Sequence, residues 1–272
     1  MDCGAMTKKF YYKVLASEDV QAVFIAQSPQ MQGVLRIAEK AADSGSPVLI
    51  FGQAGTGRGA LARWIHERGR RRNNPMFSFS CADVPQPLLE RELFGFIPQA
   101  MRGVGRGGRG LLERVQEGTM ILEEIDKLQI PLQSRLLRAV SYGELWHTGE
   151  VKIRNTDFRL ISTTTADLSA MVNEGSFRRD LYLEIGVIII RVPSLADRRE
   201  DIVPMAQSFL AAEDSRSGRV HVFTGGARLA LKNYNWPGNI PELVNLVRRL
   251  ILHEPTKSIR AVDVATHLHV GS

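Results

Sequence analysis

The chain has 272 residues, of which 44% are hydrophobic and 24% are charged, so it can form one α/β domain and a smaller one. No apolar run approaches the roughly 18 residues that cross a bilayer, and the N-terminus lacks the pattern of a signal peptide. The two cysteines, Cys3 and Cys81, have neither metal-binding nor disulfide spacing, so we expect a cytoplasmic protein without a membrane partner. The net charge of +6 is compatible with an acidic partner, such as a nucleic acid or a nucleotide, without establishing one.

In chain order, residues 1–20 show no firm periodicity and are expected to form an N-terminal tail. From Pro47, short apolar runs alternate with helical stretches, which is the pattern of βαβ units around a doubly wound parallel sheet. The predicted strands span residues 47–52, 77–81, 119–125, 158–164 and 187–192. The strands then stop, and helices are expected around a WPGN turn at residues 236–239. We therefore predict an α/β domain of nucleotide-binding type over residues 21–198 and a helical domain over residues 199–272.

The first predicted strand leads into the loop GQAGTGRG. A nucleotide-triphosphate loop has the pattern G-x-x-x-x-G-K-[ST], with the lysine on the β- and γ-phosphates and the hydroxyl on magnesium. Arg58 replaces the lysine and Gly59 replaces the hydroxyl residue. Backbone N–H groups of such a loop can still hold an anion, although a glycine turn without a ligand is the alternative. The candidate nucleotide-binding residues are Gly52, Gly55, Thr56, Gly57, Arg58 and Gly59.

Several further motifs occur in a characteristic order, and they resemble the AAA+ central domain of bacterial enhancer-binding proteins, the sigma-54-dependent transcription activators. The resemblance covers residues 24–268. It includes the phosphate loop, ELFG at 92–95, GTMILEEID at 118–126, FRRDLY at 177–182, RVPSLADRREDI at 191–202 and NWPGNIPEL at 235–243. This resemblance implies a P-loop sheet with a C-terminal helical lid, a ring oligomer, and ATP-driven remodelling of RNA polymerase holoenzyme.

The sequence departs from this family at positions that carry the chemistry. The family's Asp-Glu pair at the end of the third strand is Glu123-Glu124 here. The resemblance assigns water activation to Glu124, but Glu123 is one methylene too long for a magnesium ion that requires near-ideal octahedral geometry. At the end of the fourth strand, Thr165 stands where the family places a polarising asparagine.

The arginines that act on a neighbouring subunit's nucleotide are also altered. Arg178 fills the first of the family's two positions, whereas Glu184 replaces the second and reverses the charge. A finger arginine contributes on the order of 10³–10⁵ in rate. In the lid, Pro241 occupies the position of a sensor arginine. We therefore expect no efficient ATP hydrolysis, and only weak binding of ATP or ADP with little contribution from magnesium.

The loop that contacts sigma-54 in the family is replaced as well. Residues 96–110 read FIPQAMRGVGRGGRG, in which Met101 and Arg102 occupy the places of the contacting phenylalanine and threonine. We expect no sigma-54 contact through this loop. Arg102, Arg106 and Arg109 suggest either a segment that touches nucleic-acid phosphates or an ordinary solvated loop.

Other candidates receive simpler interpretations. His66 is expected to pack in the α/β domain, and His267 and His269 have no third metal ligand nearby in the sequence. The run RGRRR at 68–72 follows a predicted helix, where cations are favoured anyway, although it could contact an acidic partner. Neither a receiver domain nor a helix-turn-helix is evident. Contact with DNA would therefore come from a missing domain or a partner subunit.

Three hypotheses follow. The first is a non-catalytic regulator that acts in transcription through homo- or hetero-oligomerisation, or through contacts with RNA polymerase or another regulator. The second is a slow ATPase that uses Arg58, Glu123, Glu124 and Arg178. The third is a binding module for another anion, such as a cyclic dinucleotide.

Overall fold

The computed structural model describes residues 25–97, 107–253 and 257–268. The chain divides into two compact units, which we describe separately. The first unit contains Ile37–Phe51 and Arg58–Arg191. Of the described residues, the second contains Ile25–Arg36, the short segment Gly52–Gly57 and the chain from Val192 onward. The phosphate loop thus packs with the C-terminal helices, although it links two elements of the first unit.

The first unit is built on a five-stranded sheet in which all neighbouring strands are parallel. Four strands lie within the predicted ranges, and the strand at Met76 begins one residue early. The parallel sheet predicted from the sequence is therefore confirmed. In spatial order the strands are β2 (Met76–Ser80), β5 (Thr119–Glu123), β8 (Arg159–Thr164), β1 (Val48–Phe51) and β9 (Ile188–Arg191).

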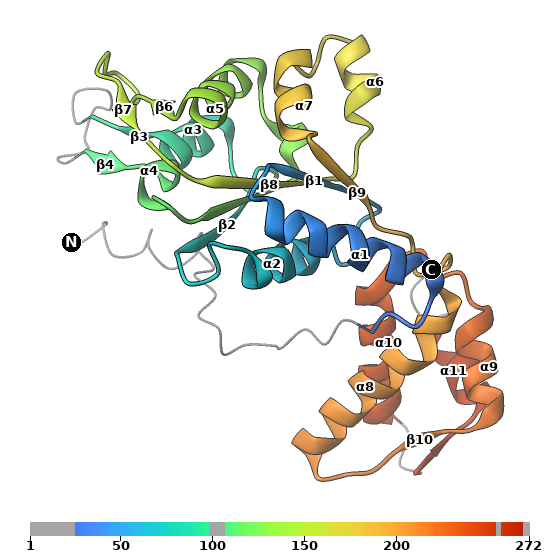
Figure 1. Cartoon of the computed structure of the whole chain (residues 1–272). Coiled ribbons are helices and arrows are strands. Elements are labelled where there is room, and N and C mark those ends of the chain that lie inside the picture. Colours follow the sequence, from blue (N-terminus) through green and yellow to red (C-terminus); the bar gives the residue numbers. More distant parts are fainter. Residues whose placement is uncertain (1–24, 98–106, 254–256, 269–272) are drawn as a thin grey trace, which may run out of the picture. The chain divides into compact units, whose positions relative to one another are not determined.

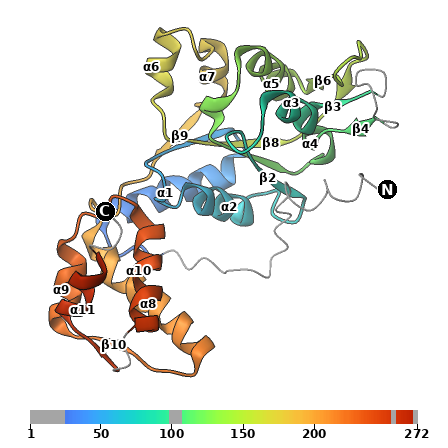
Figure 2. The same cartoon turned by 180° about the vertical axis from the view of Figure 1, so that it is seen from behind.

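Helices cover both faces of this sheet (Figures 1 and 2). On one face lie α2 (Arg58–Arg68) and the C-terminal half of α1 (Pro29–Ser44). On the other lie α3 (Gln86–Phe94), α5 (Ile130–Tyr142) and α7 (Arg179–Ile185), with the shorter α4 (Leu111–Arg114) and α6 (Leu168–Asn173). Each strand buries apolar side chains, such as Ile50, Ile121 and Ile190, because both faces of the sheet are covered.

The helix α5 illustrates how local sequence sets these elements. A proline stands in its first turn, and Gly143 ends it in the left-handed conformation. Leu132, Leu136 and Ala139 recur at helical spacing and are buried in the main apolar cluster of the unit. The apolar stripe of this helix therefore belongs to the core.

Two short antiparallel strand pairs in this unit were not predicted from the sequence. They are β3 (Gly95–Phe96) with β4 (Gly108–Arg109), and β6 (Glu144–Leu145) with β7 (Arg154–Asn155). A strand of two residues is too short to show an alternating pattern, so no sequence signal could have revealed them.

The second unit consists mainly of helices, as predicted: α8 (Arg199–Ser217), α9 (Gly225–Asn233), α10 (Asn239–His253) and α11 (Ala261–Leu268). Its core surrounds Trp236, whose Nε1 donates to Leu231 O at 2.9 Å. The prediction that strands stop after residue 199 is wrong in one respect. The two-residue strands β10 (Val222–Phe223) and β11 (Ser258–Ile259) form a parallel pair, because each backbone segment completes its hydrogen bonds with the other.

Candidate functional site

The two adjacent glutamates stand where β5 ends. Glu123 is the last residue of the strand, and Glu124 follows in the left-handed conformation with φ of 53°. A non-glycine residue with positive φ is uncommon. At Glu124 the backbone leaves the extended conformation of the strand, and a 3₁₀ helix, η2 (Ile125–Lys127), follows.

Arg58 forms an ion pair with Glu124. Its Nη2 lies 2.6 Å from Glu124 Oε1, and the two side chains are 9% and 23% exposed. The other carboxylate oxygen, Oε2, accepts a hydrogen bond from Thr165 Oγ1 at 3.2 Å. Both oxygens of Glu124 are therefore engaged by residues that the sequence analysis singled out separately. In this arrangement both carboxylate oxygens of Glu124 are already hydrogen-bonded to protein side chains, whereas a general base must lie within hydrogen-bond reach of the water that it activates.

Glu123 is held in a different environment. Its Oε1 accepts a hydrogen bond from Ser78 Oγ at 2.7 Å. A Cβ atom placed on Gly59 would lie 3.3 Å from the same oxygen, so the glycine makes room for the longer carboxylate. Two departures from the family pattern, at 59 and at 123, are thus complementary. Ser78 was not found from the sequence, because nothing in its spacing points to the glutamate.

The carboxylates do not fit a magnesium ion as they lie. Glu123 is hydrogen-bonded to Ser78 and packed against the first turn of α2, and Glu124 is paired with Arg58. Among the described residues, no group of three or more His, Cys, Asp or Glu side chains is arranged to hold a metal ion.

The phosphate loop, Gly52–Gly57, belongs to the second unit, and two of its glycines adopt positive φ values. Gly55 and Gly57 have φ of 76° and 100°. A Cβ atom at Gly55 would lie 2.8 Å from Pro241 Cδ, so the proline at the sensor position packs directly on the loop. Ile240 N donates to Gly55 O at 3.1 Å, and Asn239 Nδ2 donates to Ala54 O at 2.9 Å. The start of α10 and the loop are therefore joined by backbone and side-chain contacts that need no nucleotide.

Arg198 also shapes this loop. It is 2% exposed, and its Nη2 donates to Thr56 O at 2.7 Å. Burial lowers the pKa of this guanidinium from its usual value. Arg198 lies within the motif at 191–202, but nothing in the sequence indicated that it reaches a carbonyl more than a hundred positions away.

The finger position at Arg178 lies at the start of α7. Its guanidinium pairs with Asp180, with Nη2 2.7 Å from Oδ2, and its Nη1 donates to Ser134 Oγ at 3.0 Å. The pKa of Asp180 is lowered, chiefly by the hydrogen bond from Arg178. Gln133, buried beneath them, accepts from Arg178 N at 2.8 Å. Glu184 lies in the last turn of α7 and is half-buried.

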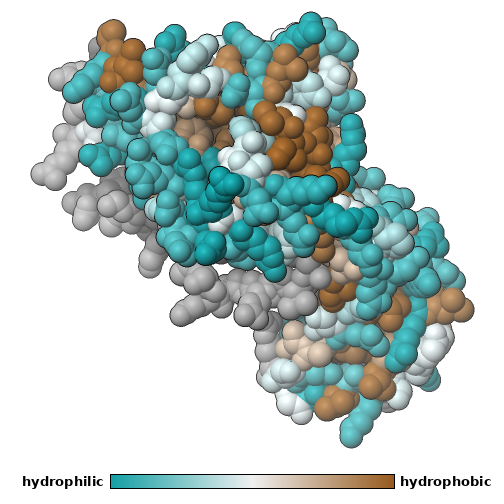
Figure 3. Space-filling model, in the orientation of Figure 1, coloured by the Kyte–Doolittle hydropathy of each residue, from teal (hydrophilic) through white to brown (hydrophobic). Residues whose placement is uncertain are grey.

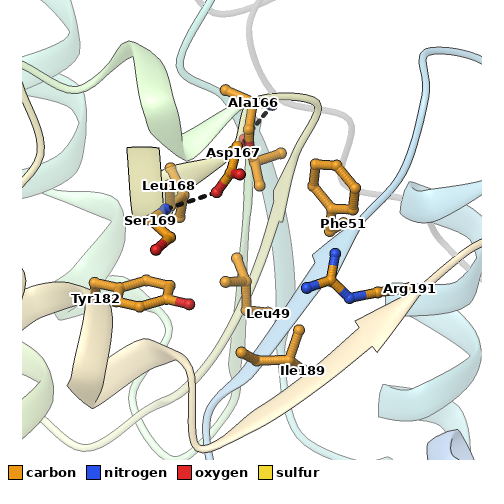
Figure 4. Close-up of a pocket in the computed structure, with 10 residues that line it drawn as sticks. Leu49, Phe51, Ala166, Asp167, Leu168, Ser169, Tyr182, Ile189 and Arg191 are labelled. Carbon is orange, nitrogen blue, oxygen red and sulfur yellow. Dashed lines mark hydrogen bonds between the residues drawn. The ribbon is translucent and has the colours of Figure 1, made fainter. Parts of the chain in front are cut away.

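A small cavity lies at the carboxyl ends of β1 and β8, beside β9 (Figure 4). Its volume is about 50 Å³, and its walls include Leu49, Tyr182 and Ile189. Arg191 lies over the ring of Phe51, with Cζ 5.5 Å from the ring centroid. A space of this size holds about one water molecule, so it is too small for a nucleotide base.

The remaining predicted residues have simpler surroundings. His66 is buried, with Nδ1 2.9 Å from Thr119 Oγ1, and burial together with the charge of Arg159 lowers its pKa. His267 stacks on His253. Arg109 is 75% exposed and lies 3.5 Å from Glu113. The predictions for Met101, Arg102, Arg106 and His269 concern residues outside the described part of the chain.

Comparison with known proteins bears on this site. A sequence model of the sigma-54 interaction domain matches residues 24–191, and a model of the AAA+ ATPase lid domain matches residues 196–272. The chain is 39% identical over 229 residues to the regulatory protein AtoC of Escherichia coli, covering 84% of this chain and 50% of AtoC. It is 41% identical over 230 residues to the transcriptional regulatory protein ZraR of the same organism, covering 84% of this chain and 52% of ZraR.

Solved structures show the same likeness. NtrX from Brucella abortus in complex with ATP matches with a TM-score of 0.80 and 29% identity, over 88% of this chain and 53% of NtrX. The chain spans about half the length of the curated relatives it matches. No helix in the described part of the chain is long and apolar enough to cross a membrane. These matches confirm the resemblance that the motifs indicated.

Proposed function

Because the chain belongs to the sigma-54 interaction domain family of AAA+ transcription regulators, we propose that it acts in transcription as a module that does not hydrolyse ATP efficiently. It acts through oligomerisation and through contacts with RNA polymerase or another regulator, in the cytoplasm. The observation that supports this proposal is the ion pair between Arg58 and Glu124. In this pair the Arg58 guanidinium contacts a carboxylate instead of a nucleotide phosphate, and the Glu124 carboxylate contacts a guanidinium instead of a water molecule.

The altered positions work in the same direction. Thr165 adds a hydrogen bond to Glu124, and Pro241 offers no charge to a phosphate group. Glu184 carries a negative charge where the family has an arginine. Pro241 and Glu184 each stand where the family has an arginine, and such positive charge stabilises the negative charge that develops in the transition state.

Phosphate release from ATP tests the proposal. We expect the chain and its Glu124→Gln variant to release phosphate at the same background rate, below about 0.1 per second, which is modest beside typical enzymes. Turnover above this rate that depends on magnesium and disappears in Glu124→Gln would refute it, and would favour the slow-ATPase hypothesis.

Nucleotide affinity provides a second measure of the same site. Gly55 and Gly57 have the positive φ values on which a phosphate loop relies, and the NtrX structures contain ADP or ATP. We propose weak binding of both nucleotides to this chain, with dissociation constants within about tenfold, or roughly 1.4 kcal/mol, of each other. Calorimetry that shows ATP with magnesium bound a hundredfold more tightly than ADP would contradict this.

The sigma-54 contact is proposed to be absent, because Met101 and Arg102 replace the contacting residues of the family loop. Reconstituted transcription from a sigma-54 promoter is the direct assay, with the chain delivered to DNA by a fused DNA-binding domain. Open-complex formation above the level seen without the chain would show that this part of the proposal is wrong.

A further inference from the structure

The turn that follows α2 concentrates positive charge on the surface of the first unit. Over residues 63–72 the chain carries five arginines and a single acidic residue, Glu67. The nucleotide site uses none of them. Figure 3 shows hydrophilic residues gathered over the face that α1 and α2 form. The structure shows how these arginines are divided between structural and solvent-facing roles.

Arg71 anchors the turn to the body of the unit. Its Nη2 lies 2.7 Å from Asp157 Oδ1, and its Nη1 donates to Gly118 O at 3.3 Å. Gly69 packs tightly beside it, since a Cβ atom there would lie 3.1 Å from Ile65 O and 3.2 Å from Ala42 O. Backbone hydrogen bonds from Gly69 N to His66 O and from Arg72 N to Gly69 O close the turn. The backbone that presents the neighbouring arginines is therefore fixed.

Arg68, Arg70 and Arg72 are exposed on this fixed turn. Arg68 stacks over the ring of Trp64, with Cζ 4.2 Å from the ring centroid, which orients its guanidinium. Within the described part of the chain, neither Arg70 nor Arg72 takes part in an ion pair. Of the described acidic residues near the turn, Asp157 is paired with Arg71, and Asp43, Glu67 and Glu117 are exposed. Within residues 63–72 themselves, five arginines stand against one acidic residue, so the turn itself is positively charged.

We propose that this arginine turn, Arg68, Arg70 and Arg72, binds the phosphate backbone of duplex DNA without sequence preference. A guanidinium presents a planar fork of donors that matches phosphate oxygens, and the group is always charged. Because the turn is already ordered, little conformational freedom is lost on binding. Trp64, the aromatic residue beside the turn in the described part of the chain, is only 8% exposed and offers little ring surface to an unpaired base, which favours a duplex over a single strand. The inference is independent of ATP hydrolysis.

The test is fluorescence anisotropy of a labelled 30-base-pair duplex titrated with the whole chain between about 50 and 200 mM salt. Binding that depends only on phosphates has dissociation constants of about 10⁻⁴–10⁻⁶ M, and each phosphate contact contributes about 0.9 to the slope of log affinity against log salt. In the variant Arg68→Gln/Arg70→Gln/Arg72→Gln we expect the slope to become shallower by about 2–3 and the affinity at 50 mM salt to fall at least about tenfold.

A matched control separates this surface from general charge. The variant Arg199→Gln/Arg219→Gln/Arg228→Gln removes three exposed arginines from the helical second unit, so both triple variants have a net charge of 6 − 3 = +3. The control should bind the duplex within about twofold of the unmodified chain. Equal losses in both variants, or no loss in the arginine-turn variant, would overturn the proposal.

Competing ligands test the partner class. We expect a single strand of the same length to bind more weakly than the duplex, and polyglutamate of matched charge to bind more weakly still. Polyglutamate that binds as tightly as the duplex would assign the surface to an acidic protein and overturn the DNA assignment. Circular dichroism of each variant shows whether its fold is retained. Arg71→Gln, which breaks the anchor, serves as a second variant that should weaken binding by disordering the turn.

Discussion

Replacing Arg58 with methionine perturbs the ion pair on which the proposed function depends. Two unit charges about 4 Å apart attract by about 4 kcal/mol at an effective dielectric constant near 20, and desolvation of both groups offsets part of this. Glu124 is 23% exposed and keeps its hydrogen bond from Thr165, while no described residue accepts a hydrogen bond from the buried Arg58 Nη1. We therefore expect Arg58→Met to lower the free energy of unfolding by about 1–2 kcal/mol.

A double-mutant cycle isolates the pair. The variants are Arg58→Met, Glu124→Gln and the combination, and urea denaturation followed by circular dichroism gives the unfolding free energy of each. If the two side chains interact as the structure shows, the double variant should lose less than the sum of the single losses, with a coupling of about 1–2 kcal/mol. A coupling below about 0.3 kcal/mol would mean that the pair does not form in solution, and the argument against catalysis would lose its main support.

The remaining predictions concern stability. Gly55→Ala should cost about 2–3 kcal/mol by urea denaturation, because φ is +76° and the new Cβ would lie 2.8 Å from a lid side chain, whereas Gly175→Ala, at φ +75° with open space around it, should cost only about 1 kcal/mol. Equal costs would show that the loop is not packed as described. The pKa of His66 is lowered from 6.5 by burial, so below pH 6.5 the unfolded chain gains a proton that the folded chain does not, and the free energy of unfolding should decrease as the pH is lowered. The variant His66→Gln should show a smaller decrease between pH 7 and pH 5, and an unchanged slope would contradict this. Arg159→Met should cost about 2–4 kcal/mol, because this buried guanidinium, whose pKa burial lowers to about 10, caps the last carbonyls of α1, while the exposed Arg70→Met should cost less than about 0.5 kcal/mol in the same assay.

The positions of the five sheet strands could be predicted from the sequence because each has short apolar stretches bounded by polar or glycine residues, and a strand in a covered sheet must bury such side chains. The phosphate loop was equally evident. Its glycines at 55 and 57 adopt positive φ values that other residues rarely accept, so the chain must place glycine there. These features depend on short stretches of chain, and a local pattern is sufficient to reveal them.

The partners of the site residues depend on the tertiary structure instead. Arg58 and Glu124 are 66 positions apart, and they meet because α2 packs on β5. Gly59 and Glu123 complement each other for the same reason, although the sequence presents them as two unrelated departures. Pro241 looked like the simple loss of an arginine, yet it packs on Gly55. Contacts between distant segments are set by how helices and strands pack. An arginine can pair with a phosphate or with a carboxylate, and its position in the sequence does not indicate which of the two it will contact.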